Sequence, residues 1–243
     1  MKEAARDGQA GFRKETNNGT IKGTMRTAIL ASQNKNKIKE IRGILDKYDL
    51  HVISRDDAGI PMDDIEETGT TFEENSMLKA SVIMDMIEAD PELKKYADSP
   101  VIADDSGLMV DALGGRPGVY SARYAGEDCS YDDNNTMLLG ELEGVPASER
   151  TAKFVTVITL IYPDGVGAPA AAEEQPDGRH VLVARGECTG HIAECKLGEG
   201  GFGYDPVFVP DGYENSFAEL GTDFKNKISH RAKALAELER LLG

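Results

Sequence analysis

The sequence predicts an α/β fold in which buried strands alternate with amphipathic helices. Two apolar runs, at 27–31 and 153–162, have the length and composition of buried strands, and the second is dense in β-branched residues. The segment 225–242 instead repeats its apolar residues at helical spacing. Its predicted buried side consists of Ile228, Ala232, Leu235, Leu238 and Leu242. With 243 residues, the chain is long enough to bury a substantial core.

The composition excludes several classes of function. The net charge is −16 and no block of basic residues occurs, whereas a protein that grips duplex nucleic acid needs a lysine and arginine footprint. No apolar run approaches the length needed to span a bilayer. Cys129, Cys188 and Cys195 are an odd set without C-x-x-C spacing, which indicates reduced thiols and no zinc site. We therefore expect a cytoplasmic protein that binds neither nucleic acid nor membranes.

The N-terminal region combines a polar extension with a strand, a loop and a helix. Residues 1–25 lack hydrophobic periodicity, so we interpret them as a flexible extension. After the strand at 27–31, the polar loop Ser32-Gln33-Asn34-Lys35-Asn36-Lys37 leads into a helix that begins near Lys35. Backbone N–H groups at a helix N-terminus favour phosphate. The loop is therefore either an anion pocket or an exposed basic first turn.

A second strand, at 51–54, is followed by an acidic loop and a long helix. Thr71 and Glu74 have the spacing of a capping box, which predicts that the helix begins directly after Thr71. The helix is expected to run to about Ala89, because a proline follows two residues later.

Three charged residues near this helix are candidates for a site. Glu66 and Glu67 precede the cap, so their side chains can reach a cleft, whereas most other acids here are typical of a solvated surface. Lys79 lies two turns into the helix. A lysine at such a position usually faces solvent, where an ion pair contributes little to stability.

The next apolar run begins at Val101 and ends in two adjacent carboxylates, Asp104 and Asp105, followed by Ser106 and a glycine. Consecutive side chains on a strand point to opposite faces, so one carboxylate can face a cleft at the end of the strand. There it can hold a divalent cation or accept a proton from water. The alternative is an ordinary polar turn, since Asp, Ser and Gly are common turn residues.

The remainder of the chain continues the alternation. Gly-Gly and Pro-Gly pairs interrupt the chain at 114–118, and a short segment then ends at Arg123. Residues 131–143 are predicted to be helical. The strands at 153–162 and 180–187 enclose a long, mobile loop at 163–179, and residues 190–193 continue the sheet.

Two further stretches carry chemistry. In Gly198–Pro206 four glycines alternate with Phe202 and Tyr204, so that an aromatic ring can lie beside closely approaching backbone. This segment is either a platform on which a base stacks or a tight turn with one core aromatic. Ser229, His230 and Arg231 lie in the first turns of the predicted last helix, and Ser229 and Arg231 flank its buried side.

Five motifs in this order resemble the inosine/xanthosine triphosphate pyrophosphatase family, over about residues 27–242. They are ASQNKNK, EETGTTFEENSMLKA, ADDSGLMVDALGGRPGVYSARYAG, GGFGYDPVF and KISHRAKAL. The resemblance implies hydrolysis of ITP, dITP or XTP to the monophosphate and pyrophosphate, with Mg²⁺. It also implies an elongated mixed β-sheet flanked by helices, two lobes with a central substrate cleft, and a homodimer. Residues 26–243 would then form one domain.

The resemblance also implies roles for residues. Asp105 corresponds to a catalytic metal ligand and proton acceptor, and Glu66 to the second metal ligand. The residues that correspond to substrate contacts are Ser32, Gln33, Asn34, Lys35, Asn36, Lys37, Lys79, Ser106, Phe202, Gly203, Tyr204, Asp205, Lys225, His230 and Arg231. The chain departs from the family at Ser32-Gln33-Asn34, where Thr-Gly-Asn is usual, in the extension at 1–25 and in the long loop at 163–179.

Two other hypotheses remain open at this point. One is a pyrophosphatase for another nucleotide, such as a modified pyrimidine triphosphate. The other is a nucleotide-binding regulator that does not hydrolyse its ligand, against which the acids and lysines argue. A Nudix hydrolase is disfavoured, because Glu66 and Glu67 lack the longer acidic helix pattern of that family.

Overall fold

The computed structural model of the protein describes residues 26–32, 35–45, 48, 50–61 and 65–243. The strands are β1 (Arg26–Leu30), β2 (Leu50–Ser54), β3 (Val101–Val110), β4 (Thr151–Tyr162), β5 (Glu173–Glu174), β6 (His180–Ile192) and β7 (Phe208–Pro210). The α-helices are α1 (Lys35–Leu45), α2 (Phe72–Ala89), α3 (Tyr131–Glu141), α4 (Phe217–Leu220), α5 (Thr222–Ile228) and α6 (His230–Leu242). The 3₁₀ helices are η2 (Pro91–Tyr96), η3 (Asp111–Leu113), η4 (Gly118–Arg123) and η5 (Ala147–Glu149).

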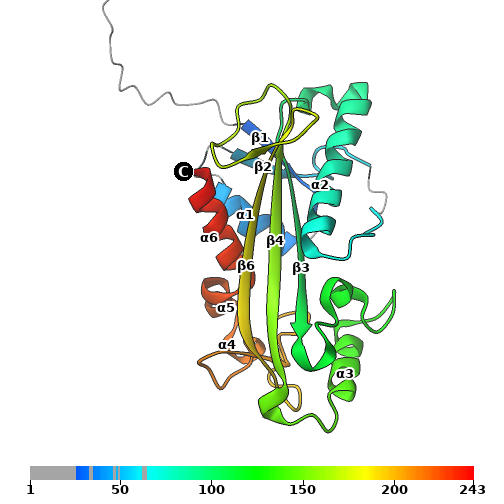
Figure 1. Ribbon diagram of the computed structural model, residues 1–243, viewed down its shortest axis with the longest axis vertical. Coiled ribbons are helices and arrows are strands. Elements are labelled where there is room, and N and C mark those ends of the chain that lie inside the picture. Colours follow the sequence, from blue (N-terminus) through cyan, green and yellow to red (C-terminus); the bar gives the residue numbers. More distant parts are fainter. Residues whose placement is uncertain (1–25, 33–34, 46–47, 49, 62–64) are drawn as a thin grey trace, which may run out of the picture.

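In the described residues, the seven strands form one mixed sheet with the order β2-β1-β3-β4-β6-β5, and β7 pairs with β6. The pairs of β1 with β2 and β3 are parallel, whereas β4 is antiparallel to both of its neighbours, β3 and β6. These three long strands form the axis of the molecule (Figure 1). The predicted α/β class with a mixed, helix-flanked sheet is thereby confirmed.

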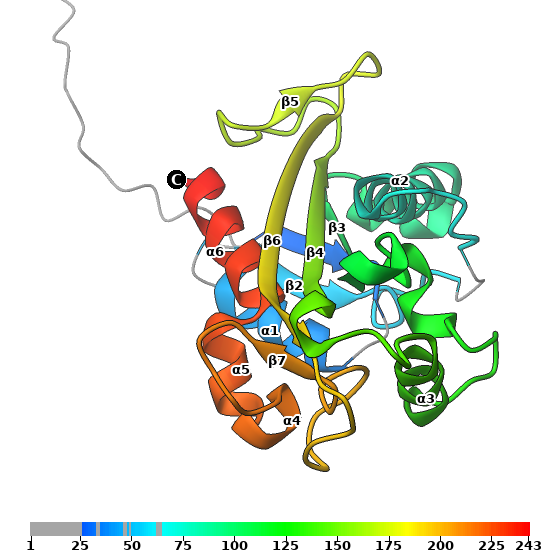
Figure 2. The same cartoon turned by 60° about the horizontal axis from the view of Figure 1, so that its bottom comes forward.

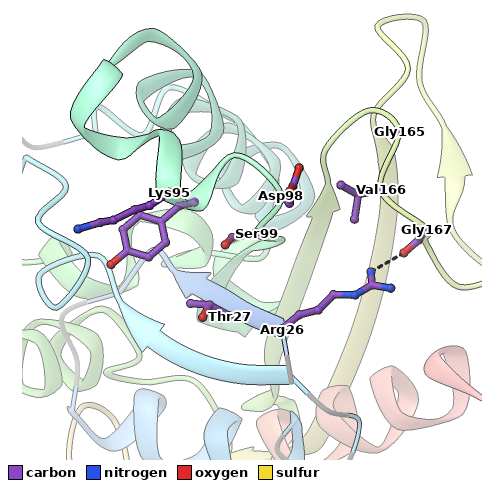
Figure 3. Close-up of a pocket in the computed structure, with 9 residues that line it drawn as sticks. Arg26, Thr27, Lys95, Asp98, Ser99, Gly165, Val166 and Gly167 are labelled. Carbon is purple, nitrogen blue, oxygen red and sulfur yellow. Dashed lines mark hydrogen bonds between the residues drawn. The ribbon is translucent and has the colours of Figure 1, made fainter. Parts of the chain in front are cut away.

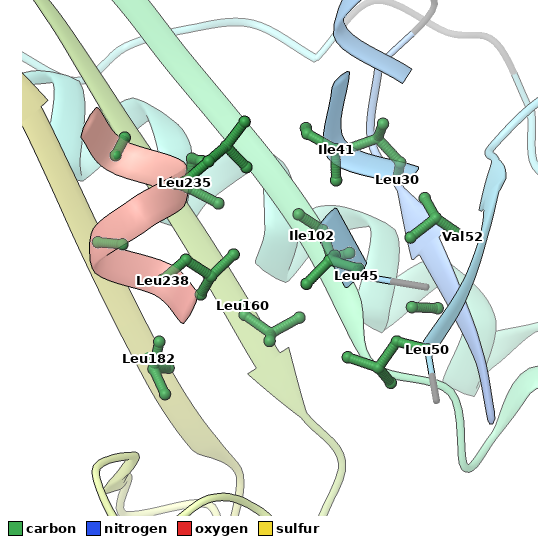
Figure 4. Close-up of a cluster of buried hydrophobic side chains, with 14 of the residues drawn as sticks. Leu30, Ile41, Leu45, Leu50, Val52, Ile102, Leu160, Leu182, Leu235 and Leu238 are labelled. Atoms are coloured by element: carbon green, nitrogen blue, oxygen red, sulfur yellow. The ribbon is translucent and has the colours of Figure 1, made fainter. Parts of the chain in front are cut away.

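Helices cover both faces of the sheet. Alternate residues of β1 divide between the faces, because Ala28 and Leu30 pack with α1 and α6, while Ile29 packs with α2. Figures 1 and 2 show α6 and α2 on opposite sides of the long strands. Figure 4 shows the cluster under α1 and α6, in which Leu235 and Leu238 face the sheet. None of the helices in the described part of the chain has the length and apolar content that a membrane crossing requires.

The structure confirms the capped long helix and corrects the last one. The hydroxyl of Thr71 accepts a hydrogen bond from the N–H of Glu74, and the Glu74 carboxylate accepts one from the N–H of Thr71, as a capping box requires. The single helix predicted over 225–242 is wrong, because Ser229 is extended and separates α5 from α6. Its hydroxyl accepts from the N–H of Ala232 and so begins a new helix.

The strand boundaries also differ from the prediction. β6 is one continuous strand through Ile192, where the sequence suggested two pieces, and β3 extends to Val110. Within the loop at 163–179, β5 pairs with the start of β6. Arg179 at its end contacts Asp85 and Glu88 of α2 at 2.7 and 2.8 Å, so the loop is attached to that helix.

Candidate active site

Asp104 and Asp105 lie in the middle of β3, opposite Ile158 and Val157 of β4. The interpretation of this stretch as a polar turn is therefore wrong. On its other side β3 pairs with β1 only at Val101 and Ile102, so it continues past the end of β1. The two carboxylates lie beside the carboxyl end of a parallel strand, where open α/β sheets bind their ligands.

The two carboxylates face opposite sides of the sheet, as consecutive residues of a strand must. Asp104 shares its face with α1, where Lys37 Nζ lies 2.7 Å from Asp104 Oδ2. The hydroxyl of Ser106 donates to the same oxygen at 3.3 Å. Burial alone would raise the pKa of Asp104, but the charges of Lys37 and Arg231 hold that pKa below its ordinary value. Asp104 is therefore a buried anion between cations from two helices.

Asp105 faces α2 and pairs with Lys79. The distance from Lys79 Nζ to Asp105 Oδ1 is 2.9 Å, and the same nitrogen lies 3.1 Å from Glu67 Oε1. Lys79 is 13% exposed and lies between these acids, which raise its pKa although partial burial opposes the rise. Burial also raises the pKa of Asp105, in spite of the attraction of Lys79. The expectation that Lys79 faces solvent is wrong.

The acid beside this pair is Glu67, where the sequence pointed to Glu66. Glu66 is exposed to solvent, whereas Glu67 is half-buried against Lys79. Of the two neighbouring acids, Glu67 is thus the one that contacts the lysine of Asp105.

The glycine-rich stretch forms a second group of contacts. Lys225 is buried and pairs with Asp205 through both carboxylate oxygens, at 2.7 and 2.6 Å. Lys225 Nζ also lies 4.0 Å from the centre of the half-buried Phe202 ring. The N–H of Phe202 donates to Asp205 at 3.0 Å, and a Cβ on Gly201 would come within 2.3 Å of that carboxylate. Glycine at position 201 thus permits the approach that fixes Phe202.

Two other residues of this stretch are tied to neighbouring backbone. The carbonyl of Gly203 accepts a hydrogen bond from the side chain of Asn135 at 2.9 Å. The buried Tyr204 hydroxyl donates to the carbonyl of Ser121 at 2.9 Å. Tyr204 therefore fixes the segment, while Phe202 presents the ring that remains partly accessible.

The start of α6 lies between the two groups. His230 is buried and stacks on Phe154, with ring centres 4.7 Å apart. Burial, and then the charges of Arg231, Lys225 and Lys37, hold the pKa of His230 well below its ordinary value. Since Arg231 also acts on the pKa of Asp104, both groups lie within electrostatic range of the α6 N-terminus. Of the two aspartates on β3, Asp104 is thus the one whose pKa Arg231 lowers.

The first loop is described in part. Ser32 is half-buried directly after β1, and Lys35 and Asn36 open α1, which carries Lys37 to Asp104. Gln33 and Asn34 lie outside the described residues. Ser106 adds a hydrogen bond to Thr156 of β4 at 2.9 Å, which fixes its hydroxyl beside Asp104.

The chain was compared with known proteins. Residues 28–241 match the model of the Ham1 family. The chain belongs to the Ham1 family. A protein named dITP/XTP pyrophosphatase from Caldanaerobacter subterraneus is 44% identical over 214 residues, 88% of this chain and 94% of that one. One of the same name from Bacillus subtilis is 42% identical, covering 90% and 98%.

Solved Ham1 structures have the same fold. The Staphylococcus aureus Ham1 protein superposes with a TM-score of 0.73 at 38% identity, and covers 89% of this chain and 98% of its own. A HAM1 protein from Coxiella burnetii gives 0.74 at 36% identity, with 90% and 98% covered.

The carboxylates of this Ham1-family site are suited to a hard divalent cation. Asp104 Oδ1 and Asp105 Oδ2 are buried, and neither has a hydrogen-bond partner among the described residues. Carboxylate oxygens are the ligands that Mg²⁺ prefers, and it usually takes only one or two of them together with water and phosphate oxygens. In the described ranges, no group of three or more His, Cys, Asp or Glu residues is arranged to hold a metal ion by itself.

A hollow elsewhere on this Ham1-family protein does not involve these residues. It has a volume of 620 Å³ and lies between the start of β1, η2 and the loop after β4 (Figure 3). Its wall includes Arg26, Lys95, Tyr96, Asp98 and Ser99. Arg26 donates to the carbonyl of Gly167 across it, at 2.9 Å. Asp104, Asp105 and Phe202 are not among its lining residues, so we place the candidate site at the carboxylates.

Sequence reasoning noted that Glu67, and one of Asp104 and Asp105, could face a cleft, but it assigned no role to Asp104, Glu67 or Arg123. The alternation of faces on β3 gave the position of Asp104, but nothing local indicated that Lys37 would reach it. Arg123 lies 3.8 Å from Glu67 Oε2 in the structure. Its contact spans 56 positions of the sequence, and no local pattern reports such a contact.

Proposed function

We propose that this protein hydrolyses the deaminated purine nucleotides ITP, dITP and XTP to the monophosphate and pyrophosphate. The observation that carries the proposal is the pair Asp104 and Asp105, each bound to its own lysine, with Arg231 within electrostatic range. The names of the Ham1 relatives support the choice of substrate. The reaction would remove abnormal purines from the nucleotide pool.

The lysines would hold the triphosphate. The chain carries a net charge of −16, so a strongly anionic ligand needs local positive charge to approach it. Lys37 and Lys79 are held at the carboxylates, where they would turn toward the phosphate oxygens. The loop residues Ser32 to Lys37 would add donors at the N-terminus of α1, a position that favours phosphate.

Asp105 and Glu67, which share Lys79, would hold Mg²⁺, and we place Glu67 in the role that the resemblance gave to Glu66. When bound, the ion would neutralise charge on the phosphates and lower the pKa of water. Asp105 would accept the proton of the water that attacks the α-phosphorus, because burial raises the affinity of this carboxylate for a proton. Pyrophosphate would leave with its charge balanced by Lys37 and Lys79.

Phe202 and Arg231 would recognise the base. The half-buried ring of Phe202 offers a face for stacking, and its contact with Lys225 fixes it. Hypoxanthine and xanthine present an oxygen acceptor at position 6, whereas adenine presents an amino donor. A donor from Arg231 would leave adenine badly paired, which discriminates strongly. Guanine shares the oxygen, so its 2-amino group must be refused separately.

Three broader expectations belong to the same proposal. The three cysteines are all free thiols, which supports a reducing, cytoplasmic location for an enzyme of the nucleotide pool. We propose that the chain acts as a homodimer and that residues 26–243 form one domain. Light scattering after size-exclusion chromatography measures the first, and limited proteolysis the second.

Hydrolysis in H₂¹⁸O tests the position of attack. Attack at the α-phosphorus places ¹⁸O in IMP and leaves the pyrophosphate unlabelled, as mass spectrometry of the products would show. Label in pyrophosphate, or release of IDP with inorganic phosphate, would contradict the proposal. An Asp105→Asn sample serves as the control for spontaneous hydrolysis.

A further inference from the structure

We propose that Arg123 is a positioning residue of this reaction, which holds Glu67 turned toward Lys79 and Asp105. The inference rests on the proposed metal-dependent hydrolysis and adds a residue to it. Arg123 belongs to the YSARYAG stretch, 18 positions after Asp105. It lies at the end of η4 and is only partly exposed.

The contacts of Glu67 show that its carboxylate is oriented by neighbouring cations. Glu67 lies in a segment without helix or strand, so the backbone alone does not orient its side chain. Its Oε1 is 3.1 Å from Lys79 Nζ, and its Oε2 is 3.8 Å from Arg123 Nη1. Each oxygen thus faces one cation, and the carboxylate is placed between them. Without Arg123, a substrate that draws Lys79 to its phosphates would leave Glu67 free to rotate into solvent.

The backbone that carries Arg123 is attached on two sides. The hydroxyl of Ser121 accepts from the N–H of Leu108 on β3 at 2.8 Å and donates to the carbonyl of Gly118 at 2.6 Å. The carbonyl of Ser121 accepts from Tyr204, which belongs to the proposed base segment. The η4 helix is therefore hydrogen-bonded both to β3, which carries the two aspartates, and to Tyr204 in the segment proposed to contact the base.

Attachment continues beyond Arg123. The side chain of Asn134, which is buried at the start of α3, donates to the carbonyl of Ala122 at 3.1 Å and accepts from the N–H of Ala125 at 2.8 Å. The two residues that flank Arg123 and Tyr124 are thus fixed to α3. Arg123 projects from a rigid turn, as a residue that orients another must.

The other contacts of the Arg123 guanidinium are weaker than its contact with Glu67, or serve only to support it. Glu127 Oε1 is 3.7 Å from its Nε, but the Glu127 side chain is 85% exposed, and such a pair contributes little. The ring of Tyr120 lies 5.4 Å from the guanidinium carbon and supports its plane. Glu67, at 25% exposure, is the better shielded anion. A planar guanidinium can contact Glu67 and Glu127 at once, which an ammonium does less well.

Mn²⁺ binding to the full-length chain, followed by electron paramagnetic resonance without nucleotide, tests the proposal. Residues that orient a metal ligand typically change affinity 10- to 100-fold when they are removed. We expect Arg123→Ala to weaken Mn²⁺ binding about 10-fold or more, and Arg123→Lys to recover most of the loss. Arg116→Ala is the matched control, because Arg116 is exposed and pairs with Glu141 away from the carboxylates. Thermal melts would establish that each variant is folded.

A double-mutant cycle separates positioning from other roles. If Arg123 acts through Glu67, Arg123→Ala should have almost no further effect on Mn²⁺ affinity in a Glu67→Gln background. An equal loss in both backgrounds, or unchanged affinity in folded Arg123→Ala, would overturn the proposal. So would a rise in the KM for ITP alone at saturating Mg²⁺, which indicates direct contact with substrate. Because Mn²⁺ binding is measured without turnover, failure here is distinct from failure of the proposed reaction.

Discussion

Asp104 and Asp105 are adjacent in the sequence but meet different cations. Strand geometry sends Asp104 to Lys37 on α1 and Asp105 to Lys79 on α2. Their proton affinities differ for the same reason, since the pKa of Asp104 is lowered and that of Asp105 is raised. Pairs of carboxyl groups whose pKa values are driven apart commonly divide the work of a site between them.

The Asp105→Asn variant tests whether Asp105 accepts the proton of the attacking water. The amide keeps the shape of the side chain and can still contact Lys79, so the fold should persist. Turnover of ITP should fall by about 100-fold or more, as for loss of a general base. Asp111→Asn is the control, because Asp111 follows the same strand but is exposed, and its carboxylate accepts from the Thr151 hydroxyl at 2.7 Å. Near-normal turnover of folded Asp105→Asn would remove this residue from the mechanism.

Arg231→Ala tests the reading of the base. Loss of a donor to position 6 should lower kcat/KM for ITP more than for ATP, so that the preference between them shrinks. Lys233→Ala, an exposed change on the same helix, should leave the ratio unchanged. A ratio of kcat/KM that is the same in Arg231→Ala as in the wild type would exclude Arg231 from base recognition.

The lowered pKa of His230 leads us to expect that folding stability depends on pH. This pKa in the folded chain lies well below 6.5, because burial and Arg231 disfavour the charged ring. The unfolded chain therefore binds the proton first, and stability, complete above about pH 6.5, falls as the pH decreases. The slope for one proton is about 1.4 kcal/mol per pH unit. Urea unfolding between pH 7 and 5 should show a flatter dependence for His230→Gln, and no such change for exposed His51→Gln.

At the scale of elements, the position of α6 depends on a glycine of β6. A Cβ at Gly186 would come within 2.2 Å of the carbonyl oxygen of His230 and the backbone nitrogen of Ala234. The helix that carries His230 and Arg231 therefore lies directly on the strand. Contact this close allows no side chain between them.

Gly186→Ala should push α6 from the sheet and lower both stability and activity. Overpacking of this kind typically costs about 1–3 kcal/mol, which chemical denaturation would measure. Gly140→Ala is the opposite control, because its added methyl meets nothing within 4 Å and lies in α3. It should stabilise the protein by about 0.5–1 kcal/mol. A Gly186→Ala protein as stable and active as the wild type would show that α6 can move without consequence.

Local sequence patterns predicted the end of an element well where a side chain hydrogen-bonds to nearby backbone. The capping box of Thr71 and Glu74 fixed the start of α2 to the residue. The apolar spacing of 225–242 did not reveal the break at Ser229, because apolar residues recur at helical spacing on both sides of it, although Ile228 and α6 pack into different clusters. Helical periodicity reports which side is buried, whereas Ser229 lacks the Glu or Gln three residues later that made the cap at Thr71 recognisable.

At the scale of the molecule, the mixed sheet determines which residues meet. Alternation of strands and helices predicted the α/β class, and the family resemblance implied the mixed sheet. The register of β3 against β4, and the early end of β1, followed from neither. These features bring Lys37, Glu67 and Arg231 to Asp104 and Asp105 from segments up to 127 positions away. The sequence motifs contained most of these residues, but which of them contact one another could be seen only in the fold.

The most direct test of the proposed reaction is a panel of nucleoside triphosphates assayed for pyrophosphate release with and without Mg²⁺. We expect rapid release from ITP, dITP and XTP, at least about 100-fold slower release from ATP, and no release from any of them without the metal. Equal rates on ATP and ITP, preference for a pyrimidine triphosphate, or full activity in the presence of a chelator would contradict it.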